Sequence, residues 1–379
     1  MQLFWMEMKK IFSWKIITLL LFANAVLYFL LFEFHIQYFP NGRPAIDHFT
    51  LEQQNIPKYG PDVNEREFAD FVAQYEKKVE DADTYLQNDP KAKAAGLTSF
   101  EAFKNAEDDS QKQMDYHDLV FFERNEDLFW ELQAMEYTIE ERYKYRTASL
   151  ESKIEGTTGA LKKHIEEIIR DEKYSFYTST VLDNFINVKK NMAINLFISI
   201  AILLSPIFLR DKLTAVELLQ YSSKKGRRIY KTKWLAGLAS SVLLTTLLLG
   251  VYLSIYAANQ TSSHFDLPLY AMNNLYSWYD LTFWQYIILS VLAIFLVSLL
   301  LSILTITIST IVSHTIGLIG VQIVTVFVMI AVVTRFLIGD IVSLRQPIWL
   351  VPLGYVLFLG AVIVFMSAIW KREMKRDIV

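Results

Sequence analysis

Residues suited to bind a partner protein gather in one short basic segment, 210–233, between two long apolar runs. Thr214 and Glu217 have the spacing of a capping box, which predicts a short helix at this point. Apolar side chains on a helix in a basic loop fit the docking of that helix into a groove on a soluble protein. Retention of positive charge in the cytoplasm explains the Lys and Arg residues, but not the apolar ones. The residues predicted to make the contact are Thr214, Glu217, Leu218, Leu219, Tyr221, Lys224, Lys225, Gly226, Arg227 and Arg228.

Sequence motifs for catalysis are absent. The chain has no GxxxxGKS or GxxxxGKT phosphate loop, no HExxH and no GxSxG. Its six histidines lack the spacing of metal ligands, and it has no cysteine for a disulfide, a thiolate nucleophile or a metal site. We therefore predict that the chain is not an enzyme and that it carries no metal or cofactor of its own.

The elements that position the basic segment are membrane spans. Residues 281–334 contain no Asp, Glu, Lys or Arg, and a bilayer core needs about 20 apolar residues per helical pass, so this run is long enough to cross twice. A small, polar, Gly-containing stretch at 313–317 is the predicted break. Four further uncharged runs lie at 16–32, 191–209, 234–257 and 346–370. The sequence thus predicts an all-α polytopic membrane protein with six transmembrane helices.

The positions of Lys and Arg predict the orientation of the spans. Basic residues cluster at 9–15, 210–233 and 371–376, and six spans place all three clusters on one side. Because basic loops stay in the cytoplasm, both termini are predicted to be cytoplasmic, in a multi-pass protein of a bacterial plasma membrane.

The N-terminal residues leave two questions open: whether the first apolar run is a cleaved signal peptide or a span, and what the residues ahead of it form. Residues 23–25, Ala-Asn-Ala, have the shape of a signal-peptide cleavage site, but apolar residues continue to 32, which favours an uncleaved span. Apolar residues at helical spacing in 3–12 predict a short helix lying in the cytoplasmic interface. A frayed extension of the first span is the alternative.

A water-soluble domain, 34–189, is predicted between the first two spans. Apolar residues recur at three- and four-residue steps in 68–86 and 128–143, and alternation typical of strands is scarce, so the domain should be helical and extracytoplasmic. The domain holds 31 Asp and Glu against 19 Lys and Arg. This excess of negative charge indicates either a solvated helical surface or a surface that attracts cationic ligands. The predicted divisions are 1–33, the domain 34–189, and 190–379 with the coupling loop 210–233.

The chain resembles the permease subunits of type-2 ABC exporters. The resemblance rests on Glu217 with Leu218 and Leu219 shortly after the second span, on the run 222–228, and on Lys233 at the third span. In that family this region is similar to a coupling helix that contacts a separate nucleotide-binding subunit. The six-span order and the interfacial helix are also similar, whereas the loop 337–346 is short for the re-entrant helices often found before the sixth span.

The resemblance implies a function and partners. The chain would be the permease of an ATP-driven exporter of a peptide, lipid-like or antimicrobial substrate, with ATP and Mg on the partner ATPase subunit. A second permease, identical or different, and membrane lipid are the other implied partners, and no nucleic acid is expected. The rivals are a mechanotransmitting ABC permease or sensor acting through its extracytoplasmic domain, a receptor, and a secondary transporter.

Polar residues at membrane depth are candidates for the translocation pathway or the permease interface. The alternative for each Ser or Thr is a hydrogen bond to its own helix backbone. The candidates are Asn195, Ser199, Thr245, Thr246, Ser302, Thr305, Thr307 and Gln322.

Overall fold

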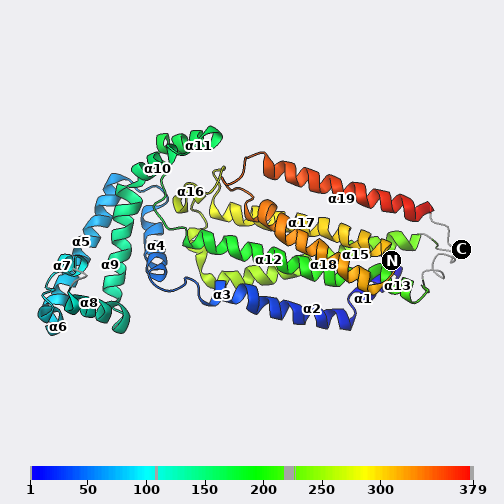
Figure 1. Cartoon of the computed structure of the whole chain (residues 1–379), viewed down its shortest axis with the longest axis horizontal. Coiled ribbons are helices and arrows are strands. Elements are labelled where there is room, and N and C mark those ends of the chain that lie inside the picture. The colour runs from blue at the N-terminus through cyan, green and yellow to red at the C-terminus, as the bar shows by residue number, and fades with distance from the viewer. Residues whose placement is uncertain (1, 107–109, 217–225, 227, 376–379) are drawn as a thin grey trace. The chain divides into compact units, whose positions relative to one another are not determined.

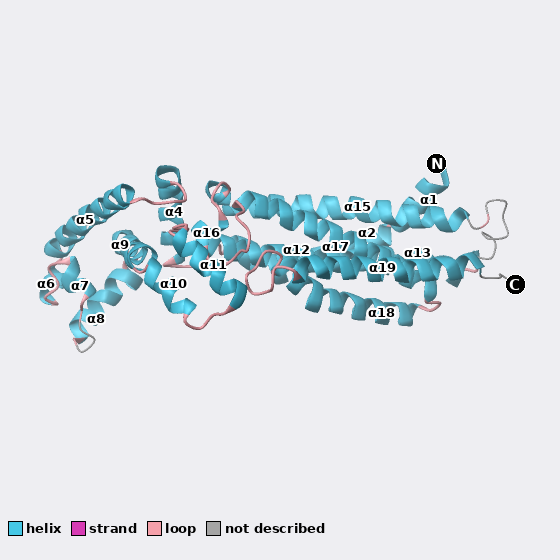
Figure 2. Ribbon diagram, turned by 90° about the horizontal axis from the view of Figure 1, so that it is seen from above, coloured by secondary structure: helices cyan, strands magenta, loops and turns pink. Residues whose placement is uncertain are grey.

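The computed structural model describes residues 2–106, 110–216, 226 and 228–375. About 80% of it is helix, and the described residues form no strand (Figure 2). The chain divides into two compact units. The membrane unit comprises Met1–Gln37, Asp183–Gln260 and Trp284–Val379, and the inserted unit comprises Tyr38–Leu182 and Thr261–Phe283.

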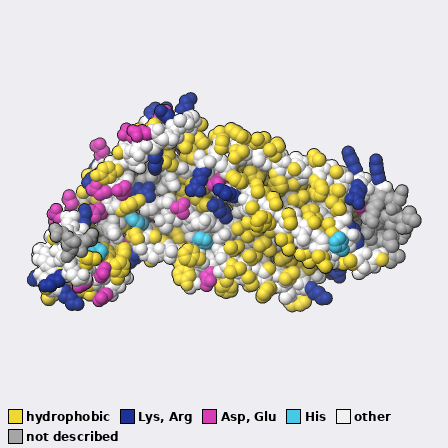
Figure 3. Space-filling model, in the orientation of Figure 1, with side chains coloured by type: hydrophobic (Ala, Val, Ile, Leu, Met, Phe, Trp, Pro, Cys, Tyr) yellow, Lys and Arg dark blue, Asp and Glu magenta, His cyan; other side chains and the backbone are white. Residues whose placement is uncertain are grey.

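Six helices are long and apolar enough to cross a membrane, which confirms the predicted all-α, six-span fold (Figure 1). These spans are Trp14–Gln37 (α2 to α3), Thr180–Leu213 (α12 and α13), Arg228–Asn259 (α15), Phe283–Ile311 (α17), Thr315–Gly339 (α18 and a π-helical end) and Leu350–Lys375 (α19). Hydrophobic side chains cover much of the membrane unit in the face shown in Figure 3. Helices that face lipid instead of other helices need such an apolar surface.

The long uncharged run breaks close to the predicted point. Helix α17 ends at Ile311, and α18 starts after His314, whose backbone is extended. A Cβ on Gly317 would lie 2.9 Å from Cδ2 of His314, closer than side-chain atoms normally pack. The absence of a side chain at Gly317 therefore lets the imidazole fold over the first turn of α18.

The N-terminal segment is a separate helix. Helix α1 spans Gln2–Ile11, and Ser13 is extended before α2 (Trp14–Leu27) begins. Glu7 and Ile11 are buried, and α1 packs against α15. The structure therefore has a helix of its own here, not a frayed start of the first span.

The inserted unit is a set of helices around an aromatic core. Its longer helices are α4 (Ala45–Tyr59), α5 (Glu65–Asn88), α9 (Asp127–Tyr137), α10 (Arg146–Ile154) and α11 (Gly159–Arg170). Three short helices, α6 (Pro90–Ala94), α7 (Phe100–Lys104) and α8 (Gln111–Asp118), follow α5. Phe103 contacts Phe100 and Phe129 in the buried cluster between them. Burial of such rings supplies most of the driving force for this fold.

A second segment, 261–283, completes the inserted unit. The division predicted from the sequence, 190–379, counts these residues with the spans. In the structure, the backbone N–H of Tyr177 donates to the carbonyl of Ala271 at 3.0 Å. His264 is fully buried, with Nε2 3.1 Å from Oε2 of Glu52 on α4. Side-chain partners far away in sequence therefore decide where this segment belongs.

We predict that His264→Ala lowers the free energy of unfolding of the inserted unit by about 1 to 3 kcal/mol or more, because a buried carboxylate oxygen of Glu52 would lose its partner. Thermal unfolding of the full chain in detergent, followed by circular dichroism, measures the effect. Ser262→Ala, at the exposed neighbouring position, is the control. Equal unfolding temperatures for the two variants would contradict the tethering role of His264.

Candidate functional site

The structure describes the residues on both sides of the predicted coupling segment, namely the end of α13 and the start of α15, which we call the two roots of the segment. Helix α13 (Pro206–Leu213) ends at Thr214, whose hydroxyl donates to the carbonyl of Arg210 at 3.0 Å. Gly226 has a left-handed backbone and leads into α15, which begins at Arg228. Thr214 is therefore the C-cap of the preceding helix, and its predicted capping box with Glu217 extends into residues outside the described ones.

The other residues predicted to contact the partner lie outside the described residues. They are Glu217, Leu218, Leu219, Tyr221, Lys224, Lys225 and Arg227. Their role in binding stays a prediction, and the structure bears on it through the two roots alone.

A buried ion pair joins these roots. Asp211 on α13 and Lys233 on α15 form a salt bridge, and the two residues are 7% and 3% exposed. Lys233 Nζ also lies 5.4 Å from the centre of the Phe208 ring. Removing either charge would leave the other buried without its partner, so the pair holds the ends of α13 and α15 together.

Helix α1 connects to the same ion pair. Lys10 Nζ lies 2.7 Å from Oε1 of Glu7, which is 3% exposed, and 4.0 Å from Oδ2 of Asp211. We call Glu7, Lys10, Asp211 and Lys233 the basal charge cluster. The cluster links the N-terminal helix to both roots of the basic segment.

Sequence reasoning missed the basal charge cluster. From the sequence, Lys10 and Lys233 count among the basic clusters at the ends of the spans, and Asp211 has no assigned partner. The sequence does contain a signal for this pair: Asp211 is an acidic residue just after the apolar run 191–209, and a carboxylate that becomes buried there needs a basic partner.

Two polar candidates for the pathway belong to a network between three helices. Asn24 Nδ2 on α2 donates to Ser199 Oγ at 3.0 Å, and Ser199 Oγ donates to Asn195 Oδ1 at 3.3 Å on α12. Tyr252 OH on α15 donates to Asn24 Oδ1 at 3.0 Å and also bonds Asn195. These side chains satisfy one another, as polar groups at membrane depth must. Asn24 was missed as a partner because the sequence placed it in a possible cleavage site.

Three further candidates, with Thr246 and Thr307, occupy other places in the membrane unit. Ser302 bonds Ser241 across α15 and α17. Thr245 and Thr305 are fully buried. Thr307 donates to its own helix, to the carbonyl of Ile303 at 2.7 Å, whereas Thr246 is exposed on α15. The buried residues of this set therefore lie where they pack between helices or bond the backbone of their own helix.

Gln322 is the candidate that lines a cavity. Its Nε2 lies 3.4 Å from the carbonyl of Thr305, and its side chain borders a groove of about 570 Å³ between α2, the α12–α13 span and α18. We call this the α18 groove. Apolar side chains form most of its wall, and Ser205, Thr315 and Gln322 supply the polar contacts. Such a lining suits the apolar part of an amphipathic molecule.

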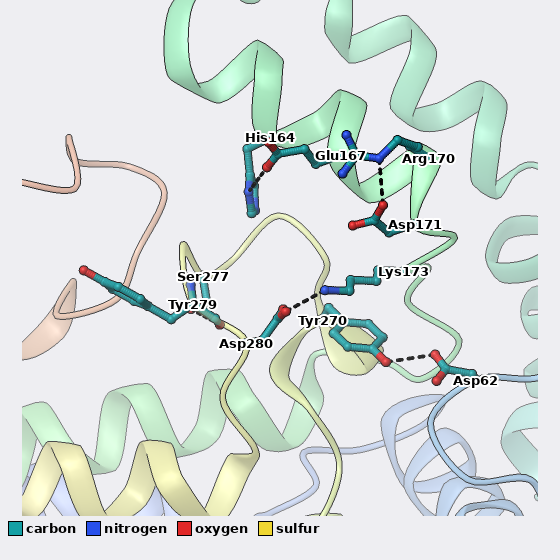
Figure 4. A network of polar contacts seen from close by, with 10 residues as sticks. All are labelled: Asp62, His164, Glu167, Arg170, Asp171, Lys173, Tyr270, Ser277, Tyr279 and Asp280. Carbon is teal, nitrogen blue, oxygen red and sulfur yellow. Dashed lines mark hydrogen bonds and ion pairs between the residues drawn. The ribbon is translucent and has the colours of Figure 1, made fainter.

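Figure 4 shows a network of polar contacts in the inserted unit that includes pairs of opposite charge. Lys173 Nζ lies 2.5 Å from Asp280 Oδ2, and Arg170 Nε donates to Asp171 at 2.8 Å. The hydrogen bond from Arg170 lowers the pKa of Asp171. No group of three or more His, Cys, Asp or Glu that could hold a metal ion occurs in the described part of the chain. The charged residues of this network therefore form ion pairs with one another.

No protein-family model matches the chain, and neither a curated protein nor a solved structure matches it. The resemblance to type-2 ABC permeases therefore rests on the sequence features given above. The structure adds that the chain is a multi-pass, helical membrane protein.

We predict that Lys233→Met destabilises the membrane unit by about 3 to 5 kcal/mol, because it removes the ammonium group from a buried salt bridge with Asp211. The double variant Asp211→Asn with Lys233→Met should lose much less, since no uncompensated charge remains. Apparent unfolding temperatures in detergent measure both effects. Lys231→Met, at an exposed position two residues away, is the control. A double variant no better than the single one would show that the ion pair is not the reason for the loss.

Proposed function

We propose that this chain is the permease subunit of an ATP-driven exporter of the type-2 ABC class. The observation that carries the proposal is the basal charge cluster, which ties α1 and both roots of the basic segment into one assembly. A loop that receives force from a partner must pass it to the spans, and the buried ion pair gives α13 and α15 a common base. Six membrane spans and the lack of a phosphate-binding loop also support this role.

Under this proposal, a separate nucleotide-binding subunit binds ATP and Mg and docks on the basic segment in the cytoplasm. Both termini lie on that side of a bacterial plasma membrane, and the inserted unit lies outside the cell. Closure of two such subunits would push on two permeases and shift a membrane dimer between two states. Helices α13 and α15 would move together, because the Asp211–Lys233 pair joins them.

The α18 groove supports a lipid-like or amphipathic peptide substrate. Its wall is mainly apolar, and Gln322 provides a polar contact at membrane depth. The second permease, identical or different, would pack on the same membrane unit. Helices α2 and α18 keep much of their apolar surface uncovered within the chain, which leaves room for such a partner as well as for lipid.

The size of the inserted unit favours a second candidate function. A helical unit with its own aromatic core is larger than a simple connection between spans requires. A mechanotransmitting ABC permease or sensor would use it to act on partners outside the membrane without passing a substrate. Uptake of substrate into inside-out vesicles separates the two functions, since only an exporter accumulates it.

We predict that the purified chain alone hydrolyses ATP no faster than a buffer blank, because it has no phosphate-binding loop. Hydrolysis should appear after addition of the nucleotide-binding subunit that co-purifies with the chain from native membranes. Release of phosphate in lipid nanodiscs measures it. Steady hydrolysis by the chain alone would overturn the proposal.

We predict that Leu218→Ser combined with Leu219→Ser reduces retention of the ATPase subunit more than Glu217→Gln does. Two apolar side chains buried in a partner contribute about 1.5 to 3 kcal/mol each, whereas an exposed ion pair contributes about 0 to 1 kcal/mol. Co-purification and ATP turnover in nanodiscs measure docking and coupling. Normal retention and coupling in the double variant would mean that this segment is not the coupling helix.

A further inference from the structure

A small polar cavity in the inserted unit has no role in the proposed function. Its volume is about 150 Å³, and it lies between the 141–153 region, the chain at 175–179 and the turn at 272–274. Leu150 and Met272 are apolar, and its other lining residues are charged or polar. Those used below are Arg142, Arg146, Lys153, Ser149, Ser175 and Glu141.

The three basic side chains of this cavity have no carboxylate partner among the described residues. No Asp or Glu oxygen of that part of the chain lies within 4.0 Å of Arg142, Arg146 or Lys153. Several basic residues elsewhere in the unit do have such partners, as Lys78 does with Glu131. Glu141 lines the cavity, but it is exposed. Three positive charges therefore face one negative charge, in a unit where carboxylates are in excess.

Aromatic rings and a hydroxyl hold the guanidinium groups in place. Arg146 Cζ lies 3.8 Å from the centre of the Tyr143 ring and 4.8 Å from that of Tyr174. Arg142 Nη1 donates to Ser175 Oγ at 3.3 Å, and its Cζ lies 5.5 Å from the Tyr137 ring. Ring contacts fix the planes of the guanidinium groups and leave N–H groups at their edges for a ligand.

One N–H group is buried without a partner. The Nε–H group of Arg142 is inaccessible to solvent and donates to no acceptor among the described residues. Buried N–H groups are nearly always hydrogen-bonded, so an acceptor supplied by a ligand would complete the site. The charge also acts on a neighbour: burial lowers the pKa of His48, and the positive charge of Arg142 adds to that effect while Glu52 opposes it.

We propose that this cavity binds a phosphate group, held by Arg142 and Arg146 with help from Lys153 and the Ser149 hydroxyl. Guanidinium groups recognise phosphate through paired N–H donors, and hydroxyls add neutral donors around a tetrahedral anion. A volume of about 150 Å³ is large enough to admit one such group. The group comes either from free phosphate or from the headgroup of a phospholipid.

The test is isothermal titration of the full chain, in an uncharged detergent, with inorganic phosphate at constant ionic strength. Arg142→Gln should raise the Kd by about 10- to 100-fold, because charge-assisted hydrogen bonds contribute on that scale. Arg170→Gln is the matched control, since it removes one Arg from the neighbouring cavity of about 260 Å³, where Asp171 already pairs with it. The control should leave the Kd unchanged.

Two further measurements keep the test decisive. Lys153 is exposed, so Lys153→Gln should fold normally and weaken binding even if Arg142→Gln proves unstable. Titration with a short-chain, water-soluble phosphatidic acid identifies the source: tighter binding than phosphate indicates a lipid headgroup, and equal binding indicates free phosphate. The proposal is overturned if neither compound binds, or if Arg142→Gln and Lys153→Gln bind phosphate as well as Arg170→Gln does.

Discussion

The buried pair of Asp211 and Lys233 is the interaction on which the membrane unit most depends. Two charges withdrawn from water are tolerated only while each faces the other. Because the pair joins the end of one span to the start of the next, it fixes the two places where the basic segment leaves the membrane unit. The contact of Lys10 with Asp211 brings α1 to the same point. A force applied to that segment would therefore act on two helix ends that an ion pair already holds together.

Lipid imposes a second constraint, which explains where the polar side chains of the spans lie. A polar group at membrane depth finds no water, so it must bond another group of the protein. Asn24, Asn195, Ser199 and Tyr252 meet this demand together and connect three helices. Gln322 bonds a backbone carbonyl and borders the α18 groove. Among these residues, Asn24, Asn195, Ser199 and Tyr252 join helices, and Gln322 lies at a groove that a ligand could enter.

The inserted unit is stabilised differently from the spans. Its core is aromatic, and about half of its basic side chains pair with carboxylates, as Lys173 does with Asp280. The basic side chains of the cavity beside Arg142 belong to the other half, since ring contacts hold its guanidinium groups where carboxylates would be expected. The same electrostatic principle covers both cases: a charge that the protein leaves unmatched is available to a ligand.

The sequence by itself determined the class of protein and its spans, because hydrophobic length and Gly at position 317 act locally along the chain. It also predicted a helical insertion, from spacing that repeats within each helix. Only the tertiary structure placed 261–283 with the inserted unit, paired Asp211 with Lys233 and gathered Asn24 and Asn195 around Tyr252. Those contacts join residues 22 to 228 positions apart. No local pattern encodes which of several distant groups will meet, since burial of a polar group requires a partner but does not name it.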